Sequence, residues 1–308
     1  MVKEPILPAH FKERYAQILG NKNGEFLKYC ALPLKKTIRI NTLKVNDAAR
    51  FAKELQAKGW NLEKIPWCDY AFNISGIEPG KTYEYFLGQI YVQEAASLIP
   101  AIVLNPEEND FVYDMCSAPG SKTTHLAQIM NNKGCIVAND ISYKRLKALG
   151  FNIELTGTLN VVVTEGDGTR AKTDERFDKI LIDAPCSCDG TVRKDWKALS
   201  RWNPKACRFM AQRQKQLLKV AAKALKSGGT LVYSTCTLSP EEDEGVIDFA
   251  LNGLGLEIQP IKLNGLKSSD CMTGWEDKEF DERVKNCLRI WPQDNDTEGF
   301  FVAKFKKI

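Results

Sequence analysis

The sequence predicts an α/β protein in which a doubly wound, mainly parallel sheet follows a small amino-terminal α+β unit. From about residue 100 onward, apolar runs of strand length alternate with helical patterns, as is typical of parallel sheets. Aspartates end several of these runs, and the residues before about 95 show a different, mixed pattern. The 308 residues, 44% hydrophobic and 27% charged, suit a globular chain with one main core and a smaller unit.

Residues 1–95 are predicted to form the small α+β domain. A helical pattern at 8–36 has Gly20 as a stop. The expected elements that follow are a strand at 37–41, a helix at 48–58 and a strand at 60–65. This part holds 14 Lys and Arg against 10 Asp and Glu, whereas the remainder holds 29 of each. The positive excess indicates contact with a polyanion such as RNA.

Residues 96–308 are predicted to form the domain with the large sheet. Its expected strands are 111–114, 135–140, 160–164, 179–183, 230–235 and 299–304. Its expected helices are 122–130, 143–155, 204–226 and 241–251. Ligands of such sheets bind at the carboxyl ends of the strands. This rule brings four side chains to one edge of the sheet: Asp114, Asp140, Asp183 and Cys236.

The turn at residues 114–123 occupies the position where dinucleotide-binding folds carry G-x-G-x-x-G, yet Gly120 is its one glycine. The turn also lacks P-loop spacing, so it does not favour a pyrophosphate, but a helix N-terminus suits a ligand with a small carboxylate. Asp140 ends the next apolar run and can hydrogen-bond a ribose diol, or else cap a helix. A nucleoside with a carboxylate and no phosphate describes S-adenosylmethionine.

Cys186 and Cys236 each follow an apolar run and lie in polar turns. The ten cysteines of this long chain, which starts without an export signal, are expected to be free thiols. No metal site is expected, because the chain has no Cys-x-x-Cys pair and just two histidines. Methylation of carbon 5 of a pyrimidine needs a thiolate to add at carbon 6, and two thiols at neighbouring strand ends could divide addition and release.

Five motifs resemble the NOL1/NOP2/Sun family of RNA cytosine-5 methyltransferases, in particular its archaeal tRNA members. They are RINTLK (39–44), GQIYVQEAAS (88–97), DMCSAPGSKTTH (114–125), DAPCS (183–187) and STCTLSPEE (234–242). The resemblance covers residues 35–305 and implies a Rossmann-like fold of the class I S-adenosylmethionine-dependent methyltransferases. It further implies methylation of cytosine in RNA, with the target base flipped out of its helix.

The resemblance also implies roles for single residues. Cys236 would be the nucleophile at carbon 6, Cys186 would assist proton removal from carbon 5 and product release, and Asp183 would hydrogen-bond the cytosine edge. Lys122 is a further candidate for contact with the base, the alternative being a solvated lysine. The residues expected around S-adenosylmethionine are Cys116, Ser117, Ala118, Pro119, Gly120, Ser121 and Lys122 at the methionine portion, Asp140 at the ribose, Asp167 at the adenine, and Arg145 and Asp183 elsewhere in the same site.

The candidate RNA contacts are Arg39 and Lys44 in the basic unit, and Arg193 and Lys194 in a loop. That loop continues with Asp195-Trp196-Lys197 where the family often has Asn-Pro-Asp, which leaves substrate choice less defined than chemistry. Because the chain is compact and shows no additional RNA-binding module, tRNA is the favoured partner and rRNA the alternative. We expect a cytoplasmic monomer without a membrane segment. The competing hypotheses are an RNA-binding assembly factor that does not need methylation and a nicotinamide dehydrogenase.

Overall fold

The computed structural model, which describes residues 7–308, contains an eight-stranded sheet with the order β10-β14-β9-β8-β5-β6-β7, β13 pairing with β14 beside this path. The parallel strands are β5 (Phe111–Asp114), β6 (Cys135–Asp140), β7 (Val161–Glu165), β8 (Phe177–Asp183) and β9 (Leu225–Thr235). The antiparallel partners of β14 (Phe300–Lys307) are β9, β10 (Leu256–Gln259) and β13 (Leu288–Ile290). The predicted doubly wound, mainly parallel sheet is confirmed.

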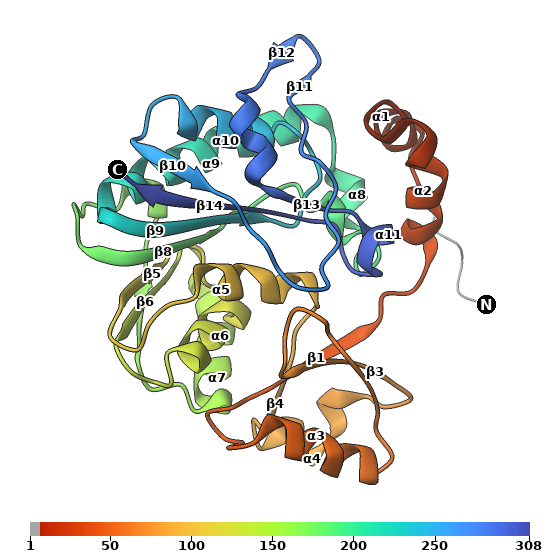
Figure 1. Cartoon of the computed structure of the whole chain (residues 1–308), viewed down its shortest axis with the longest axis vertical. Helices are drawn as coiled ribbons and strands as arrows, with labels where there is room; N and C mark the ends of the chain where they lie inside the picture. The colour runs from red at the N-terminus through yellow and green to blue at the C-terminus, as the bar shows by residue number, and fades with distance from the viewer. Residues whose placement is uncertain (1–6) are drawn as a thin grey trace.

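Helices cover both faces of this sheet (Figure 1). They are α5 (Ile99–Leu104), α6 (Ser121–Ile129) and α7 (Tyr143–Thr156) toward one face, and α9 (Pro204–Ala224) and α10 (Glu244–Leu251) toward the other. Successive strand residues point to opposite faces, so that Ile180 and Ile182 share a core with α9 and α10, whereas Leu181 packs with α5 and α6. Burial on both faces explains why these strands are continuous apolar runs in the sequence.

The small sheet is four-stranded and antiparallel, with the order β2-β3-β1-β4. Its elements are β1 (Lys36–Ile40), β2 (Asn61–Lys64), β3 (Ala71–Ser75), β4 (Ile90–Val92), α3 (Ala48–Ala57) and α4 (Tyr83–Phe86). Phe51 and Leu55 of α3 pack against Ile38 and Ile40 of β1. The side chain of Asp47 caps α3 by accepting from the Arg50 backbone N–H.

The first two helices, α1 (Ala9–Leu19) and α2 (Asn23–Ala31), do not pack on the small sheet. Gly20, with φ 54°, ends α1 as the sequence predicted. Phe11, Tyr15 and Phe26 share their core with Trp202 and other residues of the second half of the chain. The domain boundary after residue 95 stays a prediction, and α1 and α2 pack across it.

Several short elements were not expected from the sequence. They are β3, β4, α4, α5, β10, β13, the hairpin of β11 (Gly274–Trp275) and β12 (Lys278–Glu279), α8 (Ala198–Arg201) and α11 (Pro292–Asn295). Segments this short carry little periodicity and depend on distant partners. Several bounds also differ: the helical pattern expected at 8–36 ends at Ala31, α10 begins at Glu244, β14 runs to Lys307, α9 ends at Ala224 and β9 begins directly at Leu225. Across residues 7–308, no helix is both long and apolar enough to span a bilayer.

Candidate active site

The carboxyl ends of β5, β6, β8 and β9 meet at one edge of the large sheet. Asp114, Asp140 and Asp183 are the last residues of β5, β6 and β8, and Cys236 directly follows β9. Asp183 is in register with Ser234 of β9. The prediction that these four residues share one edge is therefore confirmed.

A cavity of about 470 Å³ opens at this edge. The predicted site residues that line it are Cys116, Asp140, Arg145, Asp167, Asp183, Cys186 and Cys236. Cavity-lining residues that the sequence did not single out include Asn139, Ile141, Cys188, Met210 and Arg213. One cavity thus joins the predicted cofactor end to the two predicted thiols.

The turn between β5 and α6 is anchored to the end of β6. The backbone N–H of Ser117 donates to the carbonyl of Asn139 at 2.8 Å, and that of Ala118 donates to the carboxylate of Asp140 at 3.3 Å. Gly120 has φ 107°, and a Cβ there would lie 2.7 Å from the Leu149 side chain, so the close approach of α7 requires glycine. Of the predicted residues 116–122, Cys116 alone lines the cavity.

The two predicted cofactor carboxylates have fixed partners. Asp140 accepts from the backbone N–H of Ser142 at 2.9 Å and pairs with Arg145 at 3.1 Å. Asp167 accepts from Thr169 and pairs with Arg213 at 3.6 Å. Burial raises the pKa of Asp167, but the hydrogen bonds from Thr169 and nearby arginines outweigh this effect and lower it. Both carboxylates thus line the cavity, Asp140 as the last residue of β6 and Asp167 in the turn after β7.

Lys122 is buried and paired, which makes the alternative of a solvated lysine wrong. Its side chain is 8% exposed, and Nζ donates to Asp183 Oδ2 at 2.7 Å and to Ser97 at 3.1 Å. Burial lowers the pKa of Lys122, but the charge of Asp183 outweighs it and the net change is upward. The other oxygen of Asp183 accepts from the Ser234 hydroxyl at 2.9 Å. The Lys122–Asp183 pair is therefore held in one geometry beside the thiols.

The two predicted thiols are adjacent. Cys186 Sγ lies 3.4 Å from Cys236 Sγ and 3.7 Å from Cys188 Sγ, and all three are free thiols. The hydrogen bond from Cys186 lowers the pKa of Cys236, but Cys188, burial and nearby charges raise it well above its usual range. Hydrogen bonds from Cys186 and Cys236 lower the pKa of Cys188. The resting site therefore favours a protonated Cys236.

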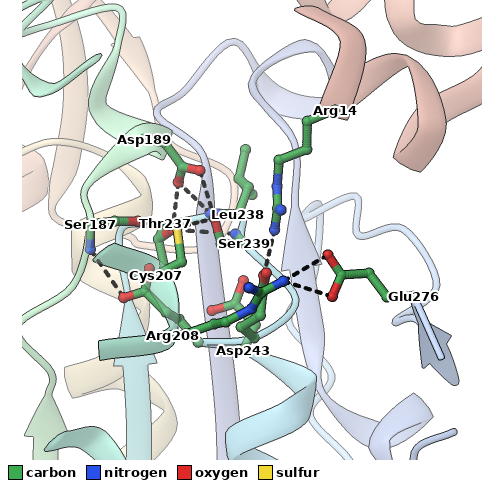
Figure 2. Close-up of polar contacts among 12 residues, drawn as sticks. Arg14, Ser187, Asp189, Cys207, Arg208, Thr237, Leu238, Ser239, Asp243 and Glu276 are labelled. Carbon is green, nitrogen blue, oxygen red and sulfur yellow. Dashed lines mark hydrogen bonds and ion pairs between the residues drawn. The ribbon is translucent and has the colours of Figure 1, made fainter. Parts of the chain in front are cut away.

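Buried carboxylates fix the turns that carry these thiols. Asp189 accepts from the Leu238 backbone N–H at 2.8 Å and from the hydroxyls of Thr237 and Ser239 at 2.5 and 2.9 Å (Figure 2). Glu242 accepts from the Ser187 backbone N–H at 3.0 Å, a contact that joins the Cys186 turn to the segment after Cys236. These bonds bring the two turns together and position Cys186 against Cys236.

The structure corrects two of the predicted RNA contacts. Arg39 is 1% exposed and donates to the Thr124 hydroxyl at 2.9 Å. Arg193 is 5% exposed and donates to the carbonyls of Leu32, Pro33 and Thr297. Neither guanidinium has the exposed surface that a phosphate contact requires.

Lys44 and Lys194 are exposed, and their roles as RNA contacts stay predictions.

Two of the cavity-lining residues that the sequence did not single out, Cys188 and Arg213, differ in whether the sequence could have revealed them. Cys188 is two residues from Cys186, so a search for Cys-x-Cys would have found it. Arg213 lies on α9, far along the chain from its partner Asp167, and nothing in its neighbourhood marks it as part of the site.

Known proteins resemble this chain over nearly its whole length. A family model described as 16S rRNA methyltransferase RsmB/F matches residues 101–306, and one described as the N-terminal domain of 16S rRNA methyltransferase RsmF matches residues 7–95. The tRNA (cytosine(49)-C(5))-methyltransferase of Pyrococcus abyssi is 42% identical over 299 residues, which cover 96% of this chain and 94% of that protein.

The ribosomal RNA small subunit methyltransferase F of Shewanella amazonensis is also 42% identical, over 92% of this chain, but the chain spans just 60% of its length. A solved structure of a methyltransferase homologue protein from Pyrococcus horikoshii superposes with a TM-score of 0.85 at 35% identity, covering 96% of this chain and 94% of that one. All of these are described as methyltransferases or their homologues, which removes the support for the dehydrogenase alternative.

Proposed function

Since the chain belongs to the 16S rRNA methyltransferase RsmB/F family, we propose that it transfers a methyl group from S-adenosylmethionine to carbon 5 of cytosine in RNA, with tRNA as the favoured substrate. The observation that carries this proposal is the 3.4 Å approach of the Cys186 and Cys236 thiols in the same cavity as Asp140 and Asp167. A cytosine ring seated there would have both thiols within reach, while the cofactor would occupy the far end.

The residues present fit S-adenosylmethionine. Asp140 at the end of β6 lines the cavity and would accept hydrogen bonds from the ribose hydroxyls. Ile141, which is 52% exposed, offers an apolar face beside it, and Asp167 offers an acceptor for the adenine amino group. The turn after β5 has neither the glycines nor the lysine spacing of a phosphate cradle, as expected for a cofactor without phosphate.

S-adenosylmethionine supplies a methyl group bonded to a cationic sulfur. Cys236 would give its proton to solvent in the open cavity and its thiolate would add to carbon 6. A sulfur–carbon bond forms, and the electron pair of the ring's 5,6 double bond makes carbon 5 nucleophilic. Asp183 and Lys122 would hold the polar edge of the base during this addition. After carbon 5 has gained the methyl group, the thiolate form of Cys186 would remove the proton from carbon 5 and pass it to solvent. The bond between Cys236 and carbon 6 would then break, which restores the aromatic ring and the Cys236 thiolate.

The choice of tRNA as the favoured substrate is supported by the substrates named for the relatives. The Pyrococcus abyssi protein, matched over 94% of its length, acts on tRNA. Ribosomal RNA is the second candidate, because the Shewanella amazonensis relative and the family description both name it. In either RNA, the target cytosine must leave its stack to reach the cavity. Lys44 and Lys194 are the exposed cations proposed to contact the backbone.

Methyl transfer to defined RNAs tests this proposal. The protein is incubated with isotopically labelled S-adenosylmethionine and either unmodified tRNA or 16S rRNA, and the digested nucleosides are identified by mass spectrometry. We expect 5-methylcytidine in tRNA and none with Cys236→Ser. Labelled 5-methylcytidine in rRNA alone would show that rRNA, and not tRNA, is the substrate. A methyl group on another atom, or full activity of Cys236→Ser, would overturn the proposed chemistry.

A further inference from the structure

Three thiols, one more than the proposed reaction uses, converge at the cavity. Cys186 Sγ lies 3.4 Å from Cys236 Sγ and 3.7 Å from Cys188 Sγ, and all three sulfurs lie within 4.8 Å of one another. Among residues 7–308, this is the one group of three or more Cys, His, Asp or Glu side chains found close enough to share an ion. The search for Cys-x-x-Cys in the sequence could not find it, because Cys236 is 50 residues from Cys186.

The spacing of the sulfurs matches that of a thiolate-bound metal ion. A zinc–sulfur bond of about 2.3 Å in a tetrahedral site separates two sulfurs by about 3.8 Å. The two shorter separations, 3.4 and 3.7 Å, are close to this value, and the third is at most 4.8 Å. Small side-chain rotations would therefore bring all three sulfurs to one ion, with a fourth position left for water.

An ion can reach this cluster, and one of its members has an unusual backbone. All three cysteines line the cavity and are half-buried rather than enclosed. Cys188 has φ 60° and ψ 23°, the left-handed region that glycine adopts at lower cost. Its carbonyl accepts from the Thr191 hydroxyl at 2.8 Å, which holds the turn in this conformation. The left-handed backbone conformation of Cys188 therefore places its thiol beside those of Cys186 and Cys236, although this conformation is unfavourable for a residue with a side chain.

We propose that Cys186, Cys188 and Cys236 form a binding site for a thiophilic divalent cation such as Zn²⁺. The ion would displace the thiol protons and coordinate both thiols that the reaction needs. The enzyme would then be reversibly inhibited by the metal, and Cys188 would set its sensitivity. Binding of the ion stands on the geometry of the three thiols, whereas inhibition rests on the proposed function.

Direct metal binding tests the site. Wild type, Cys188→Gly, Cys188→Ser and Cys135→Ser, all reduced with a phosphine, are titrated with Zn²⁺ against a chromophoric chelator, and with Co²⁺ to observe thiolate charge-transfer absorption. Glycine fits φ 60°, so Cys188→Gly is expected to fold. Cys135 is a half-buried thiol at the opposite end of β6 and serves as the control.

We expect one Zn²⁺ per wild-type chain, at least tenfold weaker binding in both Cys188 variants, and no change in Cys135→Ser. Equal affinity in wild type and Cys188→Gly, or no binding by reduced wild type, would overturn the site.

The activity of the same proteins separates the two proposals. Each variant's methyl transfer to tRNA is measured against Zn²⁺, relative to its own metal-free rate, and then after chelation with EDTA. We expect the half-inhibiting concentration to rise at least tenfold in Cys188→Gly, and EDTA to restore activity in wild type. Metal binding as expected, in a protein that methylates no RNA, would leave the site standing and overturn the proposed function. Methylation with identical Zn²⁺ sensitivity in wild type and Cys188→Gly would leave the proposed function standing and overturn inhibition through this site.

Discussion

At the scale of single residues, Asp183 connects Lys122 to the part of the site that contains the thiols. Its two carboxylate oxygens accept from Lys122 at 2.7 Å and from Ser234 at 2.9 Å, and it lines the cavity that contains both proposed catalytic thiols. Lys122 in turn is held by Ser97 at 3.1 Å. Electrostatic groups fixed in this way need no reorganisation when charge develops on a substrate.

We predict that Asp183→Asn lowers kcat by about 100-fold or more, since a fixed charge at a reacting centre contributes on this scale. The affinity for S-adenosylmethionine should change little, because Asp140 and Asp167 remain. Initial rates of methyl transfer and equilibrium binding of the cofactor measure the two effects. Ser97→Ala, which removes the other partner of Lys122, is the control and should cost much less. Loss of cofactor affinity with unchanged kcat would contradict the role given to Asp183.

Single residues also show what the sequence could not predict. Arg39 and Arg193 were predicted to contact RNA because they lie in the basic amino-terminal unit and in a loop expected near the RNA, but their partners lie far away in the chain. Thr124 is 85 residues from Arg39, and Thr297 is 104 residues from Arg193. Burial created by such distant contacts leaves no local signal.

At the scale of elements, the turns after β8 and β9 are locked together by buried acids. Glu242 accepts from the Ser187 backbone N–H and, at 2.8 Å, from Gln214, whose side chain also donates to the Pro185 carbonyl. Burial raises the pKa of Glu242 to about 8, and the charge of Asp189 acts in the same direction. The segment that carries Cys186 thus depends on a carboxyl group that titrates near neutral pH.

This pKa predicts how stability depends on pH. Between the unfolded value of about 4.3 and the folded value of about 8, the folded state binds more protons at Glu242 than the unfolded state. The contribution of Glu242 to the free energy of unfolding is therefore largest below about pH 4 and declines as the pH rises through this window. Glu242→Gln should flatten the fall in Tm between pH 5 and 8.

Thermal unfolding of wild type and Glu242→Gln across that pH range measures the effect. The exposed Glu279→Gln serves as the control and should keep the wild-type slope. An unchanged slope in Glu242→Gln would show that this carboxyl group does not titrate in the window.

Two neighbouring residues of the loop after β8 separate a structural role from RNA binding. Arg193 pairs with Asp296 at 2.7 Å and donates to three carbonyls, of which that of Thr297 is buried, whereas Lys194 is exposed. Arg193→Ala should lower the free energy of unfolding by about 3 kcal/mol, because it leaves the buried Thr297 carbonyl unpaired and removes the partner of Asp296. Lys194→Ala should leave stability nearly unchanged. It should reduce the slope of the logarithm of tRNA affinity against the logarithm of salt concentration by about one, as expected for the loss of one phosphate contact.

Denaturant unfolding and tRNA affinity at several salt concentrations measure this pair of variants. If Arg193→Ala instead kept its stability and bound tRNA weakly, Arg193 would be an RNA contact, as the sequence predicted.

At the scale of the whole molecule, buried polar contacts join the small sheet to the large domain. The Asn41 side chain donates to the carbonyls of Gly88 and Thr156 at 2.8 and 2.7 Å, and Gln128 of α6 donates to the carbonyl of Ile40 at 3.1 Å. A Cβ at Gly88 would lie 1.8 Å from the Leu155 carbonyl, so glycine is required where the small sheet approaches α7. These contacts place the small sheet beside α6 and α7 (Figure 1).

The large sheet could be predicted from the sequence because its central strands, such as β8 and β9, are buried on both faces along most of their length and therefore carry apolar runs. The acids that end those runs then located the edge of the sheet where the cavity lies. The packing of α1 and α2 against Trp202 and Trp291 could not be predicted, since amphipathic helices do not specify which surface they cover. The third thiol, that of Cys188, lies in the site because this residue has a left-handed backbone conformation, which could not be predicted from the sequence.

Covalent trapping of RNA is the most direct test of the proposed division of labour between Cys236 and Cys186. Cys186→Ala is incubated with S-adenosylmethionine and unmodified tRNA and run on a denaturing gel beside wild type, Cys236→Ala and the double variant. If Cys186 releases the product, Cys186→Ala alone gives a slow-migrating protein–RNA band, and removal of Cys236 abolishes it. A band that persists in the double variant, or its absence from Cys186→Ala while wild type methylates the same tRNA, would contradict the roles assigned to the two thiols.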